Sequence, residues 1–369
     1  MPLTLPEFPW DALLPFADTA RAHPDGIVDL SVGSPVDATP AIIRDAVLAA
    51  TDAHSYPLTA GTPTLQEAIV SWFARRRGVS ALSVANVLPT IGSKELVAGL
   101  PLWLGLGRGD IVVHPRTAYP TYAIGAELVG ATAHAGDDPA DWPEGTKLVW
   151  INSPGNPDGR VLGIEALRVA VARARELGAV IASDECYAEL AWDAPWTGRA
   201  TPSILDPAVV GEDLSSVLAV YSLSKQSNLA GYRAGLLAGS SDLVEALLAV
   251  RKHIGLIPPA PVQAAMVAAL SDDEHVSVQR ERYRVRREKL QRALTDAGFR
   301  VDRSEAGLYL WVTRGTDAWA TVAELAAIGI LCAPGTFYGV AGAGHVRIAI
   351  TATDERVDAA ARRLRASSN

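Results

Sequence analysis

The chain has 369 residues and a mass of 38.9 kDa, which suits two domains, or one large domain with a smaller companion. Apolar residues make up 49% and charged residues 20%, so the composition favours a large buried core and excludes a disordered chain. The formal net charge is −8, which argues against a nucleic-acid or anionic-membrane partner, because both bind basic surfaces.

The chain carries no sign of export, membrane insertion or metal binding. Glu7 and Asp11 lie near the N-terminus, where a secretory signal has basic residues. The longest uncharged stretch, between Glu324 and Arg347, contains Pro334 and five glycines, which are typical of loops rather than of a membrane span. Two cysteines cannot build a disulfide framework, and no two histidines lie within a helical turn of each other. We therefore expect a cytoplasmic protein with no membrane partner and no metal.

Four short apolar runs predict buried strands, at residues 111–113, 148–151, 180–182 and 217–220. Each run is continuously apolar, as in a parallel sheet that is covered on both faces. Between the second and third runs, residues 164–177 have apolar side chains at helical spacing. This alternation predicts an α/β fold with a mostly parallel, doubly wound sheet, whose ligands bind at the carboxyl ends of the strands.

The pattern changes after residue 240. Residues 243–253 and 261–297 are predicted to be mostly helical. A strand is predicted over 346–350, and a closing helix over 354–364 with Asp354 as its cap. We interpret this region as a smaller α+β domain that is joined by the N-terminal segment. The predicted boundaries are 38–245 for the large domain, and 1–37 with 246–369 for the small domain.

Polar side chains follow three consecutive strands of the predicted sheet. Asn156 lies in the turn after the second strand, Asp184 and Tyr187 follow the third, and Lys225 follows the fourth. A buried carboxylate must be paired or its pKa rises, and a lysine with a lowered pKa can form a Schiff base. A lone lysine in a loop is more often an ordinary surface residue. Here Asn156 and Asp184 follow the neighbouring strands, which favours a site where these side chains and Lys225 come together.

These motifs, in order over nearly the whole chain, resemble the aspartate-aminotransferase-like family of pyridoxal-phosphate enzymes (fold type I, class I/II). They are Asn-Pro-x-Gly at 156–159, Asp-x-x-Tyr at 184–187, and Ser-x-Ser-Lys at 222–225 with an arginine eight positions later. The resemblance implies that Lys225 binds pyridoxal 5′-phosphate as a Schiff base and that Asp184 pairs with its ring nitrogen. It also implies that Asn156 and Tyr187 hydrogen-bond the phenolic oxygen, and that the bond between Asn156 and Pro157 is cis.

The resemblance also implies how the cofactor phosphate is held. Gly92, Ser93 and Lys94 open a predicted helix, whose free N–H groups and dipole favour an anion. Ser222 and Arg233 match the family's other phosphate ligands, and Arg233 adds a permanent charge with directed donors.

Other residues are assigned by the same resemblance. The ring of Tyr119 would stack on the cofactor, and Gly33, Asn156 and Arg347 would bind the substrate, Arg347 through its planar guanidinium fork on the α-carboxylate. Tyr56 would reach the phosphate of the neighbouring subunit, which implies a homodimer. The expected partners are small amino-acid and 2-oxo-acid substrates.

Residues 5–11, 23–33 and 116–120 are similar to the actinobacterial N-succinyldiaminopimelate aminotransferases. The implied reaction transfers an amino group from glutamate to N-succinyl-2-amino-6-oxopimelate, in diaminopimelate and lysine biosynthesis, with ping-pong kinetics. The alternatives are a transaminase of other specificity or a pyridoxal-phosphate β-lyase on the same fold, since a fold does not determine a substrate. A regulator that borrows this fold is disfavoured by the acidic charge.

Overall fold

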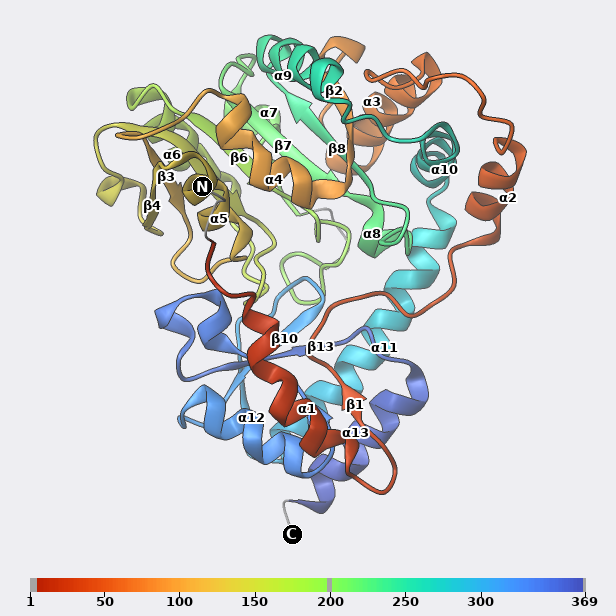
Figure 1. Ribbon diagram of the computed structural model, residues 1–369, viewed down its shortest axis with the longest axis vertical. Helices are drawn as coiled ribbons and strands as arrows, with labels where there is room; N and C mark the ends of the chain where they lie inside the picture. The colour runs from red at the N-terminus through yellow and green to blue at the C-terminus, as the bar shows by residue number, and fades with distance from the viewer. Residues whose placement is uncertain (1–4, 198–200, 368–369) are drawn as a thin grey trace.

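The computed structural model describes residues 5–197 and 201–367. The larger half of the molecule is built on a seven-stranded sheet, and the smaller half on a four-stranded sheet (Figure 1). The long helix α11 (Glu274–Asp296) runs from the larger half into the smaller one (Figure 1). This arrangement confirms the predicted α/β fold with a smaller α+β part.

The large sheet is mostly parallel. Its strands, in spatial order, are β2 (Val87–Ile91), β8 (Ala234–Gly239), β7 (Val217–Ser222), β6 (Val180–Asp184), β5 (Thr146–Asn152), β3 (Ile111–His114) and β4 (Thr132–Ala135). Only β8 runs antiparallel to both of its neighbours. The four predicted strands are confirmed as β3, β5, β6 and β7.

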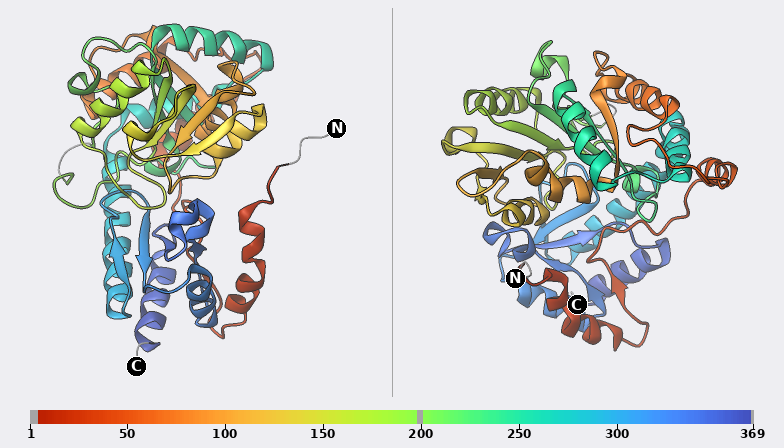
Figure 2. Two further views of the ribbon diagram at one scale, coloured as in Figure 1. Left: turned by 90° about the vertical axis from the view of Figure 1, so that its left-hand side faces the viewer. Right: turned by 45° about the horizontal axis from the view of Figure 1, so that its top comes forward.

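Helices cover both faces of this sheet, as the continuously apolar strands predicted. The helices are α2 (Ala41–Ala49), α3 (Pro63–Arg77), α4 (Gly92–Trp103), α5 (Thr121–Val129), α6 (Ile164–Glu176), α7 (Pro207–Val210), α8 (Leu223–Gln226), α9 (Ser241–Ile254) and α10 (Ala260–Ser271). Side chains of α3, α6 and α10 pack on one face, and side chains of α4, α5 and α9 pack on the other. Helix α2 lies at the edge of the larger half (Figure 2), where it packs on α10 and buries Ile43.

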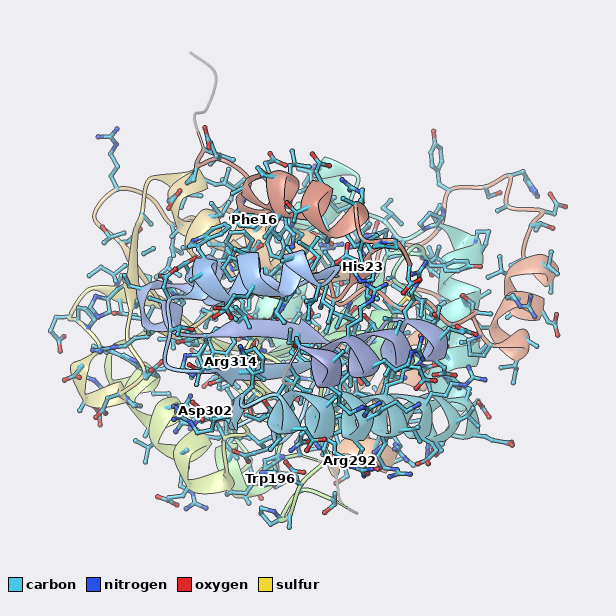
Figure 3. All side chains as sticks on the ribbon, turned by 90° about the horizontal axis from the view of Figure 1, so that it is seen from below. Phe16, His23, Trp196, Arg292, Asp302 and Arg314 are labelled. Carbon is cyan, nitrogen blue, oxygen red and sulfur yellow. The ribbon has the colours of Figure 1, made fainter. Side chains whose placement is uncertain are left out.

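The smaller half has its own hydrophobic core. Its sheet is antiparallel, in the order β12 (Ala333–Pro334), β13 (Val346–Ala349), β10 (Tyr309–Thr313) and β9 (Arg300–Asp302). The short strands β1 (Val28–Asp29) and β11 (Ile330–Leu331) pair in parallel, so the N-terminal segment joins this half. Together with α11, the end of this half is covered by the helices α1 (Leu14–Arg21), α12 (Ala318–Ala327) and α13 (Asp354–Ala366). In Figure 3, the labelled residues Phe16 and Arg292 lie on α1 and α11.

Residues 243–253 and 261–297 are mostly helical, as predicted, and form α9, α10 and α11. Helix α11 starts where the Asp272 carboxylate accepts the backbone N–H of His275. The predicted cap of the closing helix was wrong. The cap of α13 is Thr353 and not Asp354, since the Thr353 hydroxyl accepts the backbone N–H of Arg356. Asp354 instead lies in the first turn, where it pairs with Arg286.

The predicted domain boundaries at residues 38 and 245 stay a prediction. Within the two described ranges, no helix combines the length and the hydropathy that a bilayer crossing requires.

The packing of α11 yields a stability prediction. Leu290 is fully buried in the core of the smaller half, whereas Val285, on the same helix, is 44% exposed. We expect Leu290→Ala to lower the free energy of unfolding by about 2–5 kcal/mol, because it leaves a cavity in a packed core. Val285→Ala, the matched control, should change it by about 0.5 kcal/mol or less. Urea denaturation followed by circular dichroism measures both, and equal effects of the two substitutions would contradict the packing described.

Candidate active site

The carboxyl ends of β5, β6 and β7 open into a cavity of about 490 Å³, to which both halves of the molecule contribute. All but two of the predicted site residues line it, namely Gly33, Ser93, Lys94, Tyr119, Asn156, Asp184, Tyr187, Ser222, Lys225, Arg233 and Arg347. We call this space the cofactor pocket. Eleven of the residues singled out in the sequence thus lie around one cavity.

Lys225 lies on the short helix α8, directly after β7. Its Nζ donates a hydrogen bond to the backbone carbonyl of Gly33, which comes from the N-terminal segment. Burial lowers the pKa of Lys225, and the positive charges of Arg347 and Arg233 lower it further. At a given pH, a larger fraction of the Lys225 amine is therefore uncharged than for a lysine in water. The uncharged amine is the nucleophilic form.

A hydrogen-bonded chain that the sequence did not reveal supports the end of α8. The Ser227 Oγ lies 2.8 Å from the Nε2 of His275, and the His275 Nδ1 lies 2.6 Å from the Oδ2 of Asp272. Ser227 is fully buried, so it is not open to a substrate. The chain ties the segment that carries Lys225 to the start of α11.

Asp184 is a buried carboxylate at the end of β6. Its oxygens accept the Tyr122 hydroxyl at 2.9 Å and the Cys186 backbone N–H at 3.2 Å. Burial raises the pKa of Asp184, and it has no ion-pair partner among the described residues. A buried carboxylate without a cation of its own fits a ligand that brings a positive charge, as a protonated pyridine nitrogen does.

The pocket also contains a cradle for an anion. Helix α4 begins at Gly92, whose φ is +69°, and a Cβ there would lie 2.4 Å from the Nη2 of Arg233. A glycine is thus required at position 92, because of its positive φ and the closeness of Arg233. Ser93, Ser222 and Ser224 line the same wall, so N–H groups, hydroxyls and one permanent cation are available to a phosphate.

Arg347, which also lines the pocket, is fixed on several sides. Its Nη1 donates to the Asn156 side-chain oxygen at 3.0 Å, and its Nη2 donates to the Ser31 carbonyl at 2.6 Å. Its guanidinium carbon lies 3.8 Å from the centre of the Tyr309 ring. Such a fixed, planar cation suits a carboxylate. A Cβ on Gly33 would lie 2.2 Å from the Tyr309 hydroxyl, which explains the glycine beside it.

Tyr309 is a site residue that the sequence analysis missed. Its hydroxyl lies 3.5 Å from that of Tyr187. Burial alone would raise the pKa of Tyr309, but the charges of Arg347 and Lys225 lower it. Burial raises the pKa of Tyr187. Tyr309 has no motif around it, so only the sheet of the smaller half reveals its place.

Phe8 and Trp10 of the N-terminal segment were also missed as pocket residues. The Lys94 Nζ lies 5.8 Å from the centre of the Phe8 ring, and the Trp10 and Phe337 rings are 5.1 Å apart. Their aromatic character was visible in the sequence, but nothing there indicated which part of the molecule they cover.

The remaining predicted features have separate outcomes. Gly92 does not line the pocket but supports Arg233, as described above. Tyr56 is 98% exposed and lies outside the pocket lining of its own chain, so its role toward a neighbouring subunit stays a prediction. The cis bond between Asn156 and Pro157 is confirmed. No group of three or more His, Cys, Asp or Glu side chains in residues 5–197 and 201–367 could hold a metal ion.

Comparisons with known proteins agree with this geometry. The family model described as aminotransferase class I and II matches residues 25–364. The chain belongs to this family. Its members depend on pyridoxal phosphate, so the protein is a pyridoxal-phosphate-dependent aminotransferase, and the buried carboxylate, lysine and anion cradle fit that cofactor.

Two curated relatives are similar over nearly the whole chain. The 4-dedimethylamino-4-oxo-anhydrotetracycline transaminase OxyQ of Streptomyces rimosus is 56% identical over 98% of this chain and 99% of its own. A probable aminotransferase of Mycobacterium tuberculosis is 55% identical over 98% of this chain and 85% of its own. Among solved structures, a probable N-succinyldiaminopimelate aminotransferase of Thermus thermophilus has a TM-score of 0.86 and 28% identity, covering 98% of this chain and 100% of its own.

The environment of Asp184 yields a prediction with a pH dependence. Because its pKa is raised in the native state, the native state binds a proton more tightly than the unfolded state does. The free energy of unfolding therefore falls as pH rises from the unfolded pKa through the native one, and the ionised group is destabilising at neutral pH. We expect Asp184→Asn to abolish transamination and yet leave the cofactor-free protein as stable as wild type, or more stable, at pH 7.

Thermal unfolding of the cofactor-free proteins at pH 5 and pH 7 measures this effect. The exposed Asp45→Asn on α2 is the matched control, and it should change neither activity nor unfolding temperature. Full activity of Asp184→Asn, or a marked loss of its stability at pH 7, would contradict the assignment.

Proposed function

We propose that the protein transfers an amino group from L-glutamate to N-succinyl-2-amino-6-oxopimelate. The transaminase chemistry rests on one observation, the convergence of Lys225, Asp184 and Arg347 in a single pocket. The acceptor is supported by the resemblance of residues 5–11, 23–33 and 116–120 and by the likeness to the Thermus thermophilus structure.

In this proposal, each residue of the pocket has a different role. When bound, pyridoxal phosphate supplies a ring that takes up the electron pair left at the substrate Cα. Lys225 would hold the cofactor, and its Nζ, with a lowered pKa and a flexible stem, would then carry the proton between two carbon atoms. Asp184 would keep the ring nitrogen protonated, because the hydrogen bonds from Tyr122 and Cys186 favour its charged form.

The remaining contacts orient the reacting groups. Arg347, held by Asn156 and Ser31, would bind the α-carboxylate and place the Cα–H near Lys225. Asn156 and Tyr187 would face the phenolic oxygen of the cofactor. The aromatic rings of Tyr119 and Trp10 line the pocket and would limit the access of water during proton transfer.

We further propose that the active unit is a homodimer. Tyr56 is almost fully exposed, in a segment that follows helix α2 (Figure 2). A tyrosine in this position suits a contact with the phosphate site of a second copy rather than with its own.

A second candidate function is the amination of a ketone on a polycyclic compound. It is favoured by the 56% identity to the Streptomyces rimosus enzyme, whose name states such an acceptor. The Mycobacterium tuberculosis relative is nearly as similar, but its name states no substrate. Because overall identity does not select between these acceptors, a direct comparison of substrates is needed.

The place of Arg347 predicts the effect of a conservative substitution. Arg347→Lys keeps the positive charge but loses the planar fork, so we expect kcat/KM for the amino donor to fall about 10- to 100-fold, the equivalent of one charge-assisted hydrogen bond. Most of the change should appear as a higher KM, while the cofactor absorbance stays unchanged. Arg44→Lys, on the exposed side of α2, is the control. An unchanged KM would remove Arg347 from the carboxylate site.

The acceptor assignment is tested by a panel of amino donors and acceptors with the purified holoenzyme. We expect glutamate-dependent amination of N-succinyl-2-amino-6-oxopimelate, and no activity in Lys225→Ala. Amination only of a polycyclic ketone would replace the proposed acceptor with the second candidate. Release of ammonia and pyruvate would instead identify a β-lyase, and normal turnover by Lys225→Ala would overturn the mechanism.

A further inference from the structure

A second cavity of about 320 Å³ lies beside the cofactor pocket. The two spaces share Asn152, and the loop that follows β5 contributes to both. Asn156 of this loop lines the cofactor pocket, whereas Gly155 and Asp158 line the second cavity. The second cavity is therefore a neighbour of the catalytic site and has a wall of its own.

Both halves of the molecule build this cavity. Pro115, Thr117 and Leu162 come from the larger half, and Trp311 and His345 come from the sheet of the smaller half. Trp311 lies opposite Arg347 in the β10–β13 pairing, so the face of this sheet that carries the carboxylate-binding arginine continues into the second cavity. The space is a cleft between the two parts of the fold, and none of the proposed catalytic steps uses it.

Three tryptophans, Trp142, Trp150 and Trp311, line the cavity, and each is at most 5% exposed. The His345 ring lies parallel to that of Trp311, with 4.9 Å between the ring centres and 3° between the planes. Because so little of each tryptophan ring is exposed, a ligand would meet these rings at their edges. Ring edges favour contact with the face of a planar aromatic group.

Two of the three acidic side chains that line the cavity, Asp158 and Asp302, have ion-pair partners. Arg303 pairs with Asp158 at 2.5 Å. Asp302, at the edge of its sheet (Figure 3), accepts from Arg300 at 2.6 Å and lies 2.9 Å from the Nε2 of His345.

Two positively charged side chains in the lining lack such partners among the described residues. The side chains of Arg116 and Arg160 are exposed and have no hydrogen bond or ion pair within the part of the chain that the structure describes. The one acidic group without a cation, Asp137, accepts the backbone N–H of Arg116. The three side chains without an ion-pair partner, Arg116, Arg160 and Asp137, thus carry a net charge of about +1. A guanidinium group is suited to a carboxylate.

We propose that the second cavity is a binding site for a planar organic anion, namely an aromatic carboxylate. The ring of the ligand meets the exposed edges of the tryptophans, and its carboxylate is bound by Arg116 and Arg160. The site is separate from the cofactor pocket, so it does not depend on the acceptor proposed above.

Titration of the holoenzyme with 2-naphthoate by isothermal calorimetry tests this site. We expect saturable binding by wild type. The affinity should be about fivefold weaker in Arg116→Ala and in Arg160→Ala, because each variant loses a partly exposed charge-assisted contact. Arg44→Ala, an exposed arginine on α2 away from the cavity, is the matched control and should bind as wild type does. The uncharged analogue 2-naphthamide should bind more weakly than 2-naphthoate to wild type.

A second arm separates this site from the catalytic pocket. The titration is repeated with a saturating concentration of 2-oxoglutarate, and the affinity for 2-naphthoate should not change. Competition with 2-oxoglutarate would place the probe in the cofactor pocket and overturn the proposal. Absence of binding, or equal affinity in wild type and both arginine variants, would overturn it as well. An unchanged cofactor absorbance and circular dichroism spectrum confirm that the variants are folded.

Discussion

The proposed chemistry depends on the burial of one lysine amine. Lys225 stands at the end of a fully buried strand, and its Nζ contacts a carbonyl from the N-terminal segment. Burial and two nearby arginines together disfavour its ammonium form. A surface lysine on the same helix would be almost entirely protonated at neutral pH and would be a poor nucleophile. The enclosure of this amine therefore requires both halves of the fold.

Arg347 is the group that joins these halves at the site. It belongs to the smaller sheet, yet it donates to Asn156 of the larger half and to Ser31 of the N-terminal segment. A buried guanidinium is costly unless its donors are satisfied, so these contacts hold the two parts in one arrangement. The same sheet face supplies Tyr309 to the cofactor pocket and Trp311 to the second cavity. In the proposed function, substrate binding by Arg347 would therefore be coupled to the arrangement of the two halves through the β10–β13 pair.

Much of the catalytic set could be predicted, because its members follow buried strands in short motifs. Asn156, Asp184 and Lys225 each come directly after an apolar run, and the carboxyl ends of neighbouring parallel strands lie together. Tyr122 and Tyr309 could not be predicted in this way. Tyr122 lies in a helix whose apolar pattern gives no sign that its hydroxyl reaches Asp184. The wrong cap predicted for α13 has a related cause, since a cap is decided by which nearby oxygen reaches the free N–H groups.

By itself, the sequence determined the class of fold, the family and the residues in the motifs, because strand periodicity and short spacings are local properties of the chain. Only the tertiary structure decided which distant side chains complete the site. The contacts of Ser227 with His275, of Lys225 with Gly33 and of Arg347 with Ser31 join residues that are far apart along the chain. Such contacts arise from the packing of two sheets and a long helix against each other. The second cavity has the same origin, since its walls come from both halves and exist only where those halves meet.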